Sequence, residues 1–305
     1  MPVLCAILSS CGSQSKTEEA QTLHIVTTST MVTDLVENLV GDKAKVTGLM
    51  GEGVDPHSYQ ATLSDTAAIK KADVIFYSGL HLEGKVQHSL EAHAEKGNAV
   101  YAVTDAFTAD ELLSAEEDFP GAKDPHVWGN AKLWAKTPQF VAEKLAAIDP
   151  ANAEIYRSNA KALTAEYQAL HEWAVKRANE IPKQSRLLIT SHDAFFYFGD
   201  AYGFKVSGLQ GISTESQTSL KHRANLIKKI KKAKIKAIFP ESSVNAKGIQ
   251  AVAKEAGIEL SKEELFSDAM GKKGDTATIN GETYDKGTYP GMIKHNINTI
   301  VEALK

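Results

Sequence analysis

Short apolar runs recur along the chain, and each is followed by a polar loop and then by apolar residues at helical spacing. Apolar runs bounded in this way are typical of buried strands, and their alternation with helical patterns is typical of parallel α/β folds. Eight runs predict strands, at residues 23–27, 45–49, 74–77, 100–103, 187–190, 205–209, 237–239 and 258–260. The pattern therefore predicts an α/β protein of two lobes, each built on a four-stranded, mostly parallel sheet with flanking helices.

One long helical segment separates the two groups of strands. Residues 151–181 are rich in Ala, Glu, Lys and Leu and contain neither Gly nor Pro, while Pro150 and Pro182 bound them. A continuous helix of this length would extend about 45 Å. We therefore expect a first lobe at 23–150, a linking helix at 151–181 and a second lobe at 182–305, with each lobe packed around its own core.

Composition narrows the class of protein. The 305 residues are 43% hydrophobic and 24% charged, which is ordinary for globular proteins and excludes disorder as the main state. No run approaches the roughly 18 consecutive apolar residues of a membrane-spanning helix. The net charge of -4 gives no electrostatic footprint for nucleic acid. We therefore expect a monomer whose partners do not include nucleic acid.

One stretch of the second lobe is strongly basic. Residues 221–236 contain eight Lys or Arg side chains, interleaved with an apolar stripe that includes Leu226, Ile227 and Ile230. This spacing is typical of the solvent face of an amphipathic helix. A docking patch for a partner or for anionic lipid is the alternative, although one such helix does not make a basic domain.

Both cysteines lie near the start of the chain. The absence of Cys after Cys11 excludes disulfides, cysteine zinc sites and thiol nucleophiles from the remainder. Leu8-Ser9-Ser10-Cys11 has the pattern that lipoprotein signal peptidases cleave, and a polar segment follows it. No basic residue precedes Lys16, which is the pattern expected where Met1 lies within a longer leader. We expect residues 1–22 to be a leader remnant and tether with lipid on Cys11; a buried Cys in an apolar strand is the alternative.

Three histidines and one aspartate stand out as candidates for metal binding. Asp-Pro-His occurs twice, ending at His57 and His126, and proline stiffens both loops. His192 directly follows a predicted strand, and Asp268 lies beyond the last one. Intervals of 69, 66 and 76 residues exclude a local finger or a His-Glu-x-x-His helix. They fit a site assembled in a cleft between two lobes, where ligands gather at the carboxyl ends of strands.

Each of these histidines, taken singly, is more often a hydrogen-bonded structural residue than a ligand. The repeated Asp-Pro-His and the strand-end position of His192 favour the metal site. His81 also follows a strand and is expected, at most, beside the ligands. If all three candidate histidines titrate near their usual pKa of about 6.5, acidification through that pH should release a bound ion.

Several phrases in order resemble the zinc- and manganese-binding solute receptors of bacterial ABC transporters, the cluster A-I or TroA-like lipoproteins. They run through the chain from about residue 23 to residue 304, and they are Gly53-Val54-Asp55-Pro56-His57, Tyr77-Ser78-Gly79-Leu80-His81-Leu82-Glu83, Asp124-Pro125-His126-Val127-Trp128, His192-Asp193-Ala194-Phe195, Gly208-Leu209-Gln210-Gly211-Ile212-Ser213, Phe239-Pro240-Glu241-Ser242-Ser243 and Leu265-Phe266-Ser267-Asp268-Ala269-Met270.

The resemblance implies two α/β lobes joined by one long backbone helix. It implies metal ligands at His57, His126, His192 and Asp268, with Glu241 close to the cleft but not itself a ligand. It further implies an extracytoplasmic binding protein, in the periplasm or on the cell surface, that is anchored through Cys11 and delivers its ion to an ABC permease and its cytoplasmic ATPase.

Departures from the family's subgroups bear on the metal. Manganese-dedicated relatives usually have Glu where His192 stands, and zinc-dedicated relatives often carry a His-rich acidic loop between the first two ligands. That region here holds Asp110, Glu111 and the acidic residues 116–118 but no histidine cluster. The pattern resembles the type with three histidines and one aspartate, which is associated with both metals. We expect one Zn²⁺ or Mn²⁺ per chain, zinc the tighter, with Fe²⁺ as a further candidate.

Rival classes differ in what the site must do. A metallohydrolase usually keeps three protein ligands and an open position for water, whereas four are expected here, so we expect a binding protein rather than an enzyme. A siderophore or haem receptor of similar architecture would bind a coloured ligand. A role in cell adhesion is neither supported nor excluded by the residues.

Overall fold

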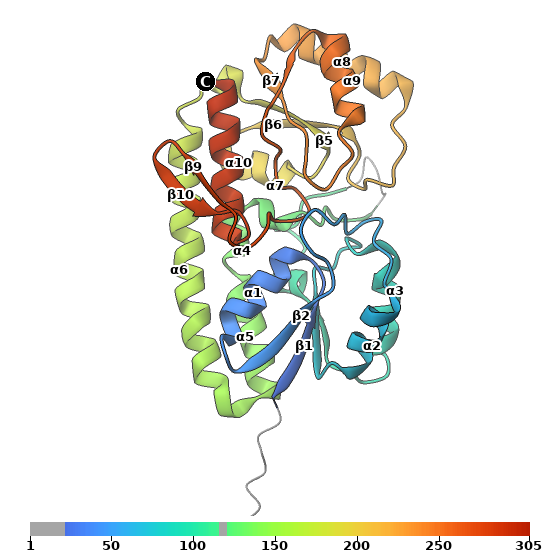
Figure 1. Ribbon diagram of the computed structural model, residues 1–305, viewed down its shortest axis with the longest axis vertical. Helices are drawn as coiled ribbons and strands as arrows, with labels where there is room; N and C mark the ends of the chain where they lie inside the picture. Colours follow the sequence, from blue (N-terminus) through green and yellow to red (C-terminus); the bar gives the residue numbers. More distant parts are fainter. Residues whose placement is uncertain (1–21, 116–120) are drawn as a thin grey trace, which may run out of the picture.

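The computed structural model describes residues 22–115 and 121–305 and arranges them in two α/β lobes joined along one long helix (Figure 1). Cys11 and the predicted leader lie outside the described residues, as do the acidic residues 116–118. No helix in the described part of the chain combines the length and apolar character needed to cross a membrane.

The first lobe is built on one parallel sheet. Its strands follow the order β2-β1-β3-β4, and all neighbouring pairs are parallel. The strands are β1 (Leu23–Thr27), β2 (Ala44–Gly48), β3 (Val74–Tyr77) and β4 (Val100–Ala102). The helices of this half are α1 (Thr30–Val40), α2 (Leu63–Lys71), α3 (Gly84–Ala94), α4 (Ala131–Trp134) and α5 (Thr137–Ile148). The four predicted strands are confirmed to within one residue, because short apolar runs between polar loops leave little choice of strand boundaries.

The second lobe also has its four predicted strands, but they form two parallel pairs. The first pair is β5 (Leu187–His192) with β6 (Lys205–Gln210), and the second is β7 (Ala237–Ile238) with β8 (Glu259–Leu260). A single backbone bond from Phe239 N to Ile189 O, 2.9 Å long, connects β7 to β5. The helices of this lobe are α7 (Phe196–Tyr202), α8 (Leu220–Ala233) and α9 (Lys247–Ala256). Because β7 and β8 have only two residues each, continuous sheet pairing stops after each pair.

A hairpin and a terminal helix follow β8. The hairpin joins β9 (Thr276–Ile279) to β10 (Glu282–Asp285), and α10 (Tyr289–Leu304) comes last. The hairpin was not predicted, although Asn-Gly is its usual turn signal. Asn280 and Gly281 both have positive φ, at 54° and 77°, as that two-residue turn requires.

The linking helix α6 (Ala153–Ala178) has 26 residues, which corresponds to about 39 Å. Trp173 on α6 donates to Glu282 of the hairpin, and α10 lies alongside α6 (Figure 1). The expectation of one separate core per lobe holds only in part. Each lobe has a small buried cluster, but the largest cluster includes Leu35 of α1, Tyr156 of α6 and Ile297 of α10. The two lobes therefore share their main core.

The basic stretch forms the amphipathic helix α8. Leu226 and Ile230 are buried, while its lysines are exposed at the outer end of the second lobe. The solvent-face interpretation is confirmed, because the apolar stripe packs inward against its own lobe.

Candidate metal centre

The structure brings His57, His126, His192 and Asp268 together where the lobes meet. Each offers one ligand atom, and these four atoms lie within 4.8 Å of one another. His192 is the last residue of β5, and His57, His126 and Asp268 lie on the segments that follow β2, β4 and β8 respectively. Two come from each half of the chain, as the sequence spacing predicted.

The donor spacing fits a single metal ion. His57 Nε2 and His126 Nε2 are 3.3 Å apart, and the Asp268 oxygens lie 3.0 to 3.6 Å from the three Nε2 atoms. A tetrahedral ion with bonds of about 2.0–2.1 Å needs its ligands about 3.3–3.4 Å apart. The cluster is also dry, since its four side chains are at most 4% exposed. Three imidazoles and one carboxylate at these distances form a donor set that could hold a divalent transition metal.

The loop that carries His126 is organised by Asp124. Its Oδ1 accepts the His126 backbone N–H at 2.9 Å and the ring Nδ1–H at 2.7 Å. Asp124 is fully buried, and Trp128 packs edge-on against the imidazole. The carboxylate therefore fixes the tautomer that leaves His126 Nε2 free to bind metal. In the sequence this motif stands out for its proline, and the role of the carboxylate was not predicted.

The loop that carries His57 is held differently. Asp55 Oδ1 accepts the His57 backbone N–H at 2.9 Å, but Oδ2 accepts the hydroxyls of Ser58 and of Thr214 in the other lobe. Behind this loop, Gly84 has φ of 43°, and a Cβ there would lie 2.4 Å from the His57 carbonyl oxygen. Only glycine allows the close approach that supports His57 from the first lobe.

Glu241 orients His192. Its Oε1 accepts the His192 backbone N–H at 2.9 Å, and its Oε2 lies 2.5 Å from His192 Nδ1. Both side chains are buried. Glu241 contacts a predicted ligand from behind and is outside the four-residue cluster, as expected.

The Asp268 loop is tied to the first lobe. Trp128 Nε1 donates to the carbonyl oxygen of Ser267, and Met270 N donates to Thr30 Oγ1. These two bonds flank Asp268 on both sides, so the carboxylate is positioned by residues of both lobes.

The three histidines differ in their proton affinity. Burial, together with the neighbouring imidazoles, lowers the pKa of His57 to about 4. Burial also acts to lower the pKa of His126, but Asp124 and Asp268 outweigh it and raise that pKa to about 9. Burial is likewise outweighed at His192, where Asp268 and Glu241 hold the pKa well above its usual value. Common titration of all three histidines near 6.5 is therefore wrong for this site.

The same electrostatics act on the carboxylate. Burial alone would raise the pKa of Asp268, but His192 and His126 hold it well below its ordinary value. Near neutral pH these shifts favour an anionic Asp268 beside protonated His126 and His192. An incoming cation replaces two protons there.

In the segment from Tyr77 to Glu83, the histidine is exposed and the glutamate is buried. His81 is exposed and lies outside the cluster. Glu83 is fully buried and accepts bonds from Thr28 Oγ1, Ser78 N and Gly79 N. The buried glutamate, which the sequence analysis did not single out, fixes the turn that ends at Gly84 against the His57 loop.

Two α/β lobes that share a buried donor set for a transition metal define the class: a two-lobed binding protein with one enclosed site. The family model described as "Zinc-uptake complex component A periplasmic" matches residues 25–303, and the chain belongs to this family.

Relatives match along nearly their whole length. The manganese-binding lipoprotein MntA of Bacillus subtilis (strain 168) is 43% identical over 303 residues, which are 98% of this chain and 95% of that protein. The zinc-binding protein TroA of Treponema pallidum (strain Nichols) is 38% identical, over 96% of this chain and 92% of TroA. The iron ABC transporter substrate-binding lipoprotein MtsA of Streptococcus pyogenes serotype M1 is 32% identical, with coverage of 98% and 94%.

The fold agrees with the sequence comparison. The solved structure of periplasmic zinc-binding TroA from Treponema pallidum superposes with a TM-score of 0.86 at 38% identity, covering 93% of this chain and 99% of TroA. The α/β class and the two-lobed arrangement predicted from the sequence are therefore confirmed.

Proposed function

We propose that this protein is the extracytoplasmic solute-binding component of an ABC importer and that its cargo is a divalent transition metal ion. The observation that carries the proposal is the buried cluster of three histidines and one aspartate, with donor atoms spaced for one ion. The names of the relatives, which bind manganese, zinc or iron, support the same role.

The ligands in this proposal are His57, His126, His192 and Asp268. Asp124 and Glu241 hold the rings of His126 and His192 through Nδ1, so that Nε2 of each points at the ion. His57 has no such carboxylate on its ring among the described residues, and its loop is set through the backbone instead.

The donor chemistry admits both zinc and manganese. Imidazole suits zinc and carboxylate suits manganese, and at equal geometry zinc binds more tightly. Both Asp268 oxygens face the imidazoles, so bidentate binding can raise the coordination number for manganese. Zinc is therefore the tighter ligand, and supply decides which ion is carried, with Fe²⁺ a weaker third candidate.

Delivery requires only a small movement of the lobes. We place the lobes at 23–150 and 182–305, with 151–181 as the linking segment. The shared core and the bonds from Trp128 to Ser267 and from Thr30 to Met270 oppose a wide hinge. Release to the permease and its ATPase therefore depends on displacing one ligand-bearing loop.

The anchor in this proposal is lipid on Cys11, which holds the protein outside the cytoplasmic membrane, in the periplasm or at the cell surface. The lipobox pattern supports it, and relatives of the full chain length are named lipoproteins. Hydrolysis is no part of the proposed function, because protein donors take all four positions of a tetrahedral ion, one of which a catalytic site usually leaves to water.

Competition calorimetry tests the function and the choice of metal. Metal-free protein is titrated with Zn²⁺ and Mn²⁺ separately and in competition, with His81→Ala as a control because this exposed histidine lies outside the cluster. One ion per chain, zinc the tighter, and an unchanged control are expected. Failure to bind either ion overturns the receptor role, and tighter manganese binding overturns only the proposed order of affinity.

The cargo in the native organism needs a second measurement. Metal analysis of protein purified from its own organism, together with the mass of its N-terminus, identifies the ion carried and the lipid on Cys11. An unmodified N-terminus at full length would remove the anchor from the proposal.

A further inference from the structure

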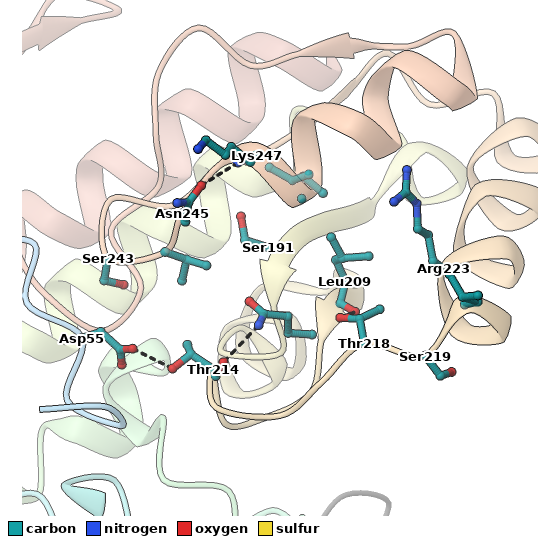
Figure 2. Close-up of a pocket in the computed structure, with 15 residues that line it drawn as sticks. Asp55, Ser191, Leu209, Thr214, Thr218, Ser219, Arg223, Ser243, Asn245 and Lys247 are labelled. Atoms are coloured by element: carbon teal, nitrogen blue, oxygen red, sulfur yellow. Dashed lines mark hydrogen bonds between the residues drawn. The ribbon is translucent and has the colours of Figure 1, made fainter.

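A cavity of about 520 Å³ lies mainly in the second lobe (Figure 2), and its lining includes Ser191, the residue before His192, and Asp55 of the first lobe. It lies beyond the carboxyl ends of β5 and β6 and is bordered by the first residues of α8 and α9. This is where α/β lobes bind ligands. None of the four cluster residues lines it, so the cavity needs an explanation of its own.

Two helices begin at this cavity. Ser219, Leu220 and Arg223 line it from α8, and Lys247, Gly248 and Ile249 line it from α9. The first N–H groups of a helix have no partner within that helix, and the N-terminus carries a partial positive charge. Ser219 Oγ accepts the His222 N–H, and Asn245 Oδ1 accepts the Lys247 N–H. The remaining first-turn N–H groups of the two ends favour an anion at this cavity.

Two charged side chains, Arg223 and Lys247, add to the partial positive charge of the helix ends. Lys247 forms no ion pair with any residue in ranges 22–115 and 121–305, while Arg223 is paired only from one side, with Glu255 at 3.1 Å. Asp55 is the single acid among the lining residues, and its carboxylate already accepts Thr214 and Ser58 hydroxyls and the His57 N–H. Two cations against one acid therefore line the cavity, and Lys247 is the cation whose charge no ion pair offsets in the described ranges.

The side chain of Ser191 is a buried hydroxyl without a hydrogen-bond partner among the described residues, and a bound ligand would supply one. Ser191 is 2% exposed. Figure 2 shows its hydroxyl pointing from β5 into the cavity, toward the start of α9. Its neighbour Thr190 instead donates to the His192 carbonyl at 2.8 Å. An unpaired buried hydroxyl is costly, so a donor aimed at a positively charged cavity points to an absent acceptor.

We propose that this cavity binds a small organic anion, with its phosphate or carboxylate group at the starts of α8 and α9 and accepting a hydrogen bond from Ser191. The volume lies within the range of small-molecule sites and leaves room for an organic body beyond the anionic group. This site goes beyond metal capture. Its lining excludes the metal donors, so the anion binds with or without metal.

The site nevertheless shares strand β5 and the loop that carries His57 with the metal cluster. Ser191 precedes His192, and Asp55 holds the His57 backbone while Thr214 reaches it from the cavity side. An anion bound in the cavity therefore lies next to residues of both lobes.

Calorimetry on the metal-free full chain tests the site with defined probes. Glycerol 3-phosphate and citrate represent phosphate and carboxylate anions, inorganic phosphate tests the anionic group alone, and glycerol is the neutral control. Binding of at least one organic anion, with no heat from glycerol, is expected. If all three anions give no heat at millimolar concentration, the proposal is wrong.

Variants separate this cavity from general attraction by positive charge. Lys247→Gln is expected to weaken anion binding about tenfold, the loss of one charge-assisted bond. Lys228→Gln removes the same charge from an exposed position of α8 outside the cavity and is expected to change nothing. Equal weakening by both variants would overturn the proposal.

Ser191→Ala separates a binding role from a structural one. It removes an unpaired hydroxyl, so the thermal stability of the ligand-free protein should not fall, while anion affinity should fall about tenfold. Unchanged affinity in both Ser191→Ala and Lys247→Gln would place the anion elsewhere and overturn the assignment.

Discussion

The two Asp-Pro-His loops have the same tripeptide and the same backbone bond, yet their histidines are in opposite electrostatic states. In both, the aspartate Oδ1 accepts the histidine N–H at 2.9 Å. At the second loop, buried Asp124 also binds the ring of His126. At the first, the remaining oxygen of half-buried Asp55 faces hydroxyls of Ser58 and Thr214, and the ring of His57 has no carboxylate behind it among the described residues.

This difference follows from what surrounds each loop. Proline and the aspartate side chain set the local turn, whereas the partner of the imidazole depends on how deeply the aspartate is buried. The pKa of His126 is accordingly raised to about 9 and that of His57 lowered to about 4. One motif thus supplies a proton-holding ligand and a neutral ligand to the same site.

The largest predicted effect is that of pH on metal affinity. Metal must displace one proton from His126 and one from His192, so affinity should rise about a hundredfold per pH unit near neutral pH. His57 is already neutral there and adds no further dependence. Calorimetry in buffers of different ionisation enthalpy should show about two protons released per ion at neutral pH. An affinity that levels off above pH 7 would contradict the raised pKa of His126.

The stability of the metal-free protein sharpens the same contrast. Because the pKa of His126 is raised on folding, its stabilising contribution is complete below pH 6.5 and is lost as the pH rises through about 9. Because the pKa of His57 is lowered, its contribution is present above pH 6.5 and is lost as the pH falls through about 4. Denaturant unfolding of the metal-free protein between pH 4 and pH 9 measures the free energy of unfolding and so tests both the loss at low pH and the loss at high pH.

Removing each histidine should separate binding from folding. His57→Ala and His126→Ala should each weaken metal binding more than about hundredfold, since outer partners alone contribute about 10–100-fold. His126→Ala also leaves buried Asp124 without its cation and Asp268 with His192 alone, and should cost about 3–5 kcal/mol of metal-free stability. His57→Ala should cost less, and equal losses would remove the distinction between the loops.

Replacing the aspartate of each Asp-Pro-His motif by asparagine tests whether the two motifs differ in function. Asp124→Asn should weaken metal binding about 10–100-fold at pH 9. The loss should shrink at pH 7, because the variant no longer holds the competing proton on His126. Asp55→Asn keeps an oxygen for the His57 N–H and should change affinity less than about threefold. Similar effects of both variants, measured by calorimetry at the two pH values, would mean that Asp124 acts only as a turn residue.

The smallest expected effect concerns the bond between the lobes at Asp55. Thr214→Val removes the hydroxyl that reaches Asp55 Oδ2 at 2.7 Å, in a half-buried position. The variant is expected to lose about 1 kcal/mol or less of the free energy of unfolding. Stopped-flow release of metal to a chelator should be accelerated by no more than about fivefold. A larger acceleration would show that this bond controls the position of the His57 loop.

Much of the fold follows from short-range features of the chain. The strand positions in both lobes, the linking helix and the amphipathic α8 all came from apolar periodicity and bounding prolines, which act within a few residues. The hairpin was missed although Asn280-Gly281 marks it, because its strands are only half apolar. The place of α10 against α6 and α1 could not be predicted, since periodicity gives the buried face of a helix but not its partner.

The sequence by itself singled out the four candidate donors, because His57 and His126 share a stiffened motif, His192 follows a predicted strand and Asp268 lies beyond the last one. Only the tertiary structure decided what each donor became. Asp268 is held between lobes by Trp128 and Thr30, residues distant in the chain, and the proton affinity of each imidazole depends on which carboxylates that packing brings near. The burial of the Ser191 hydroxyl without a partner, near the start of α9, likewise depends on tertiary packing. Residue types and turns are local properties, whereas burial and most charge neighbours arise from contacts between segments that are far apart in the chain.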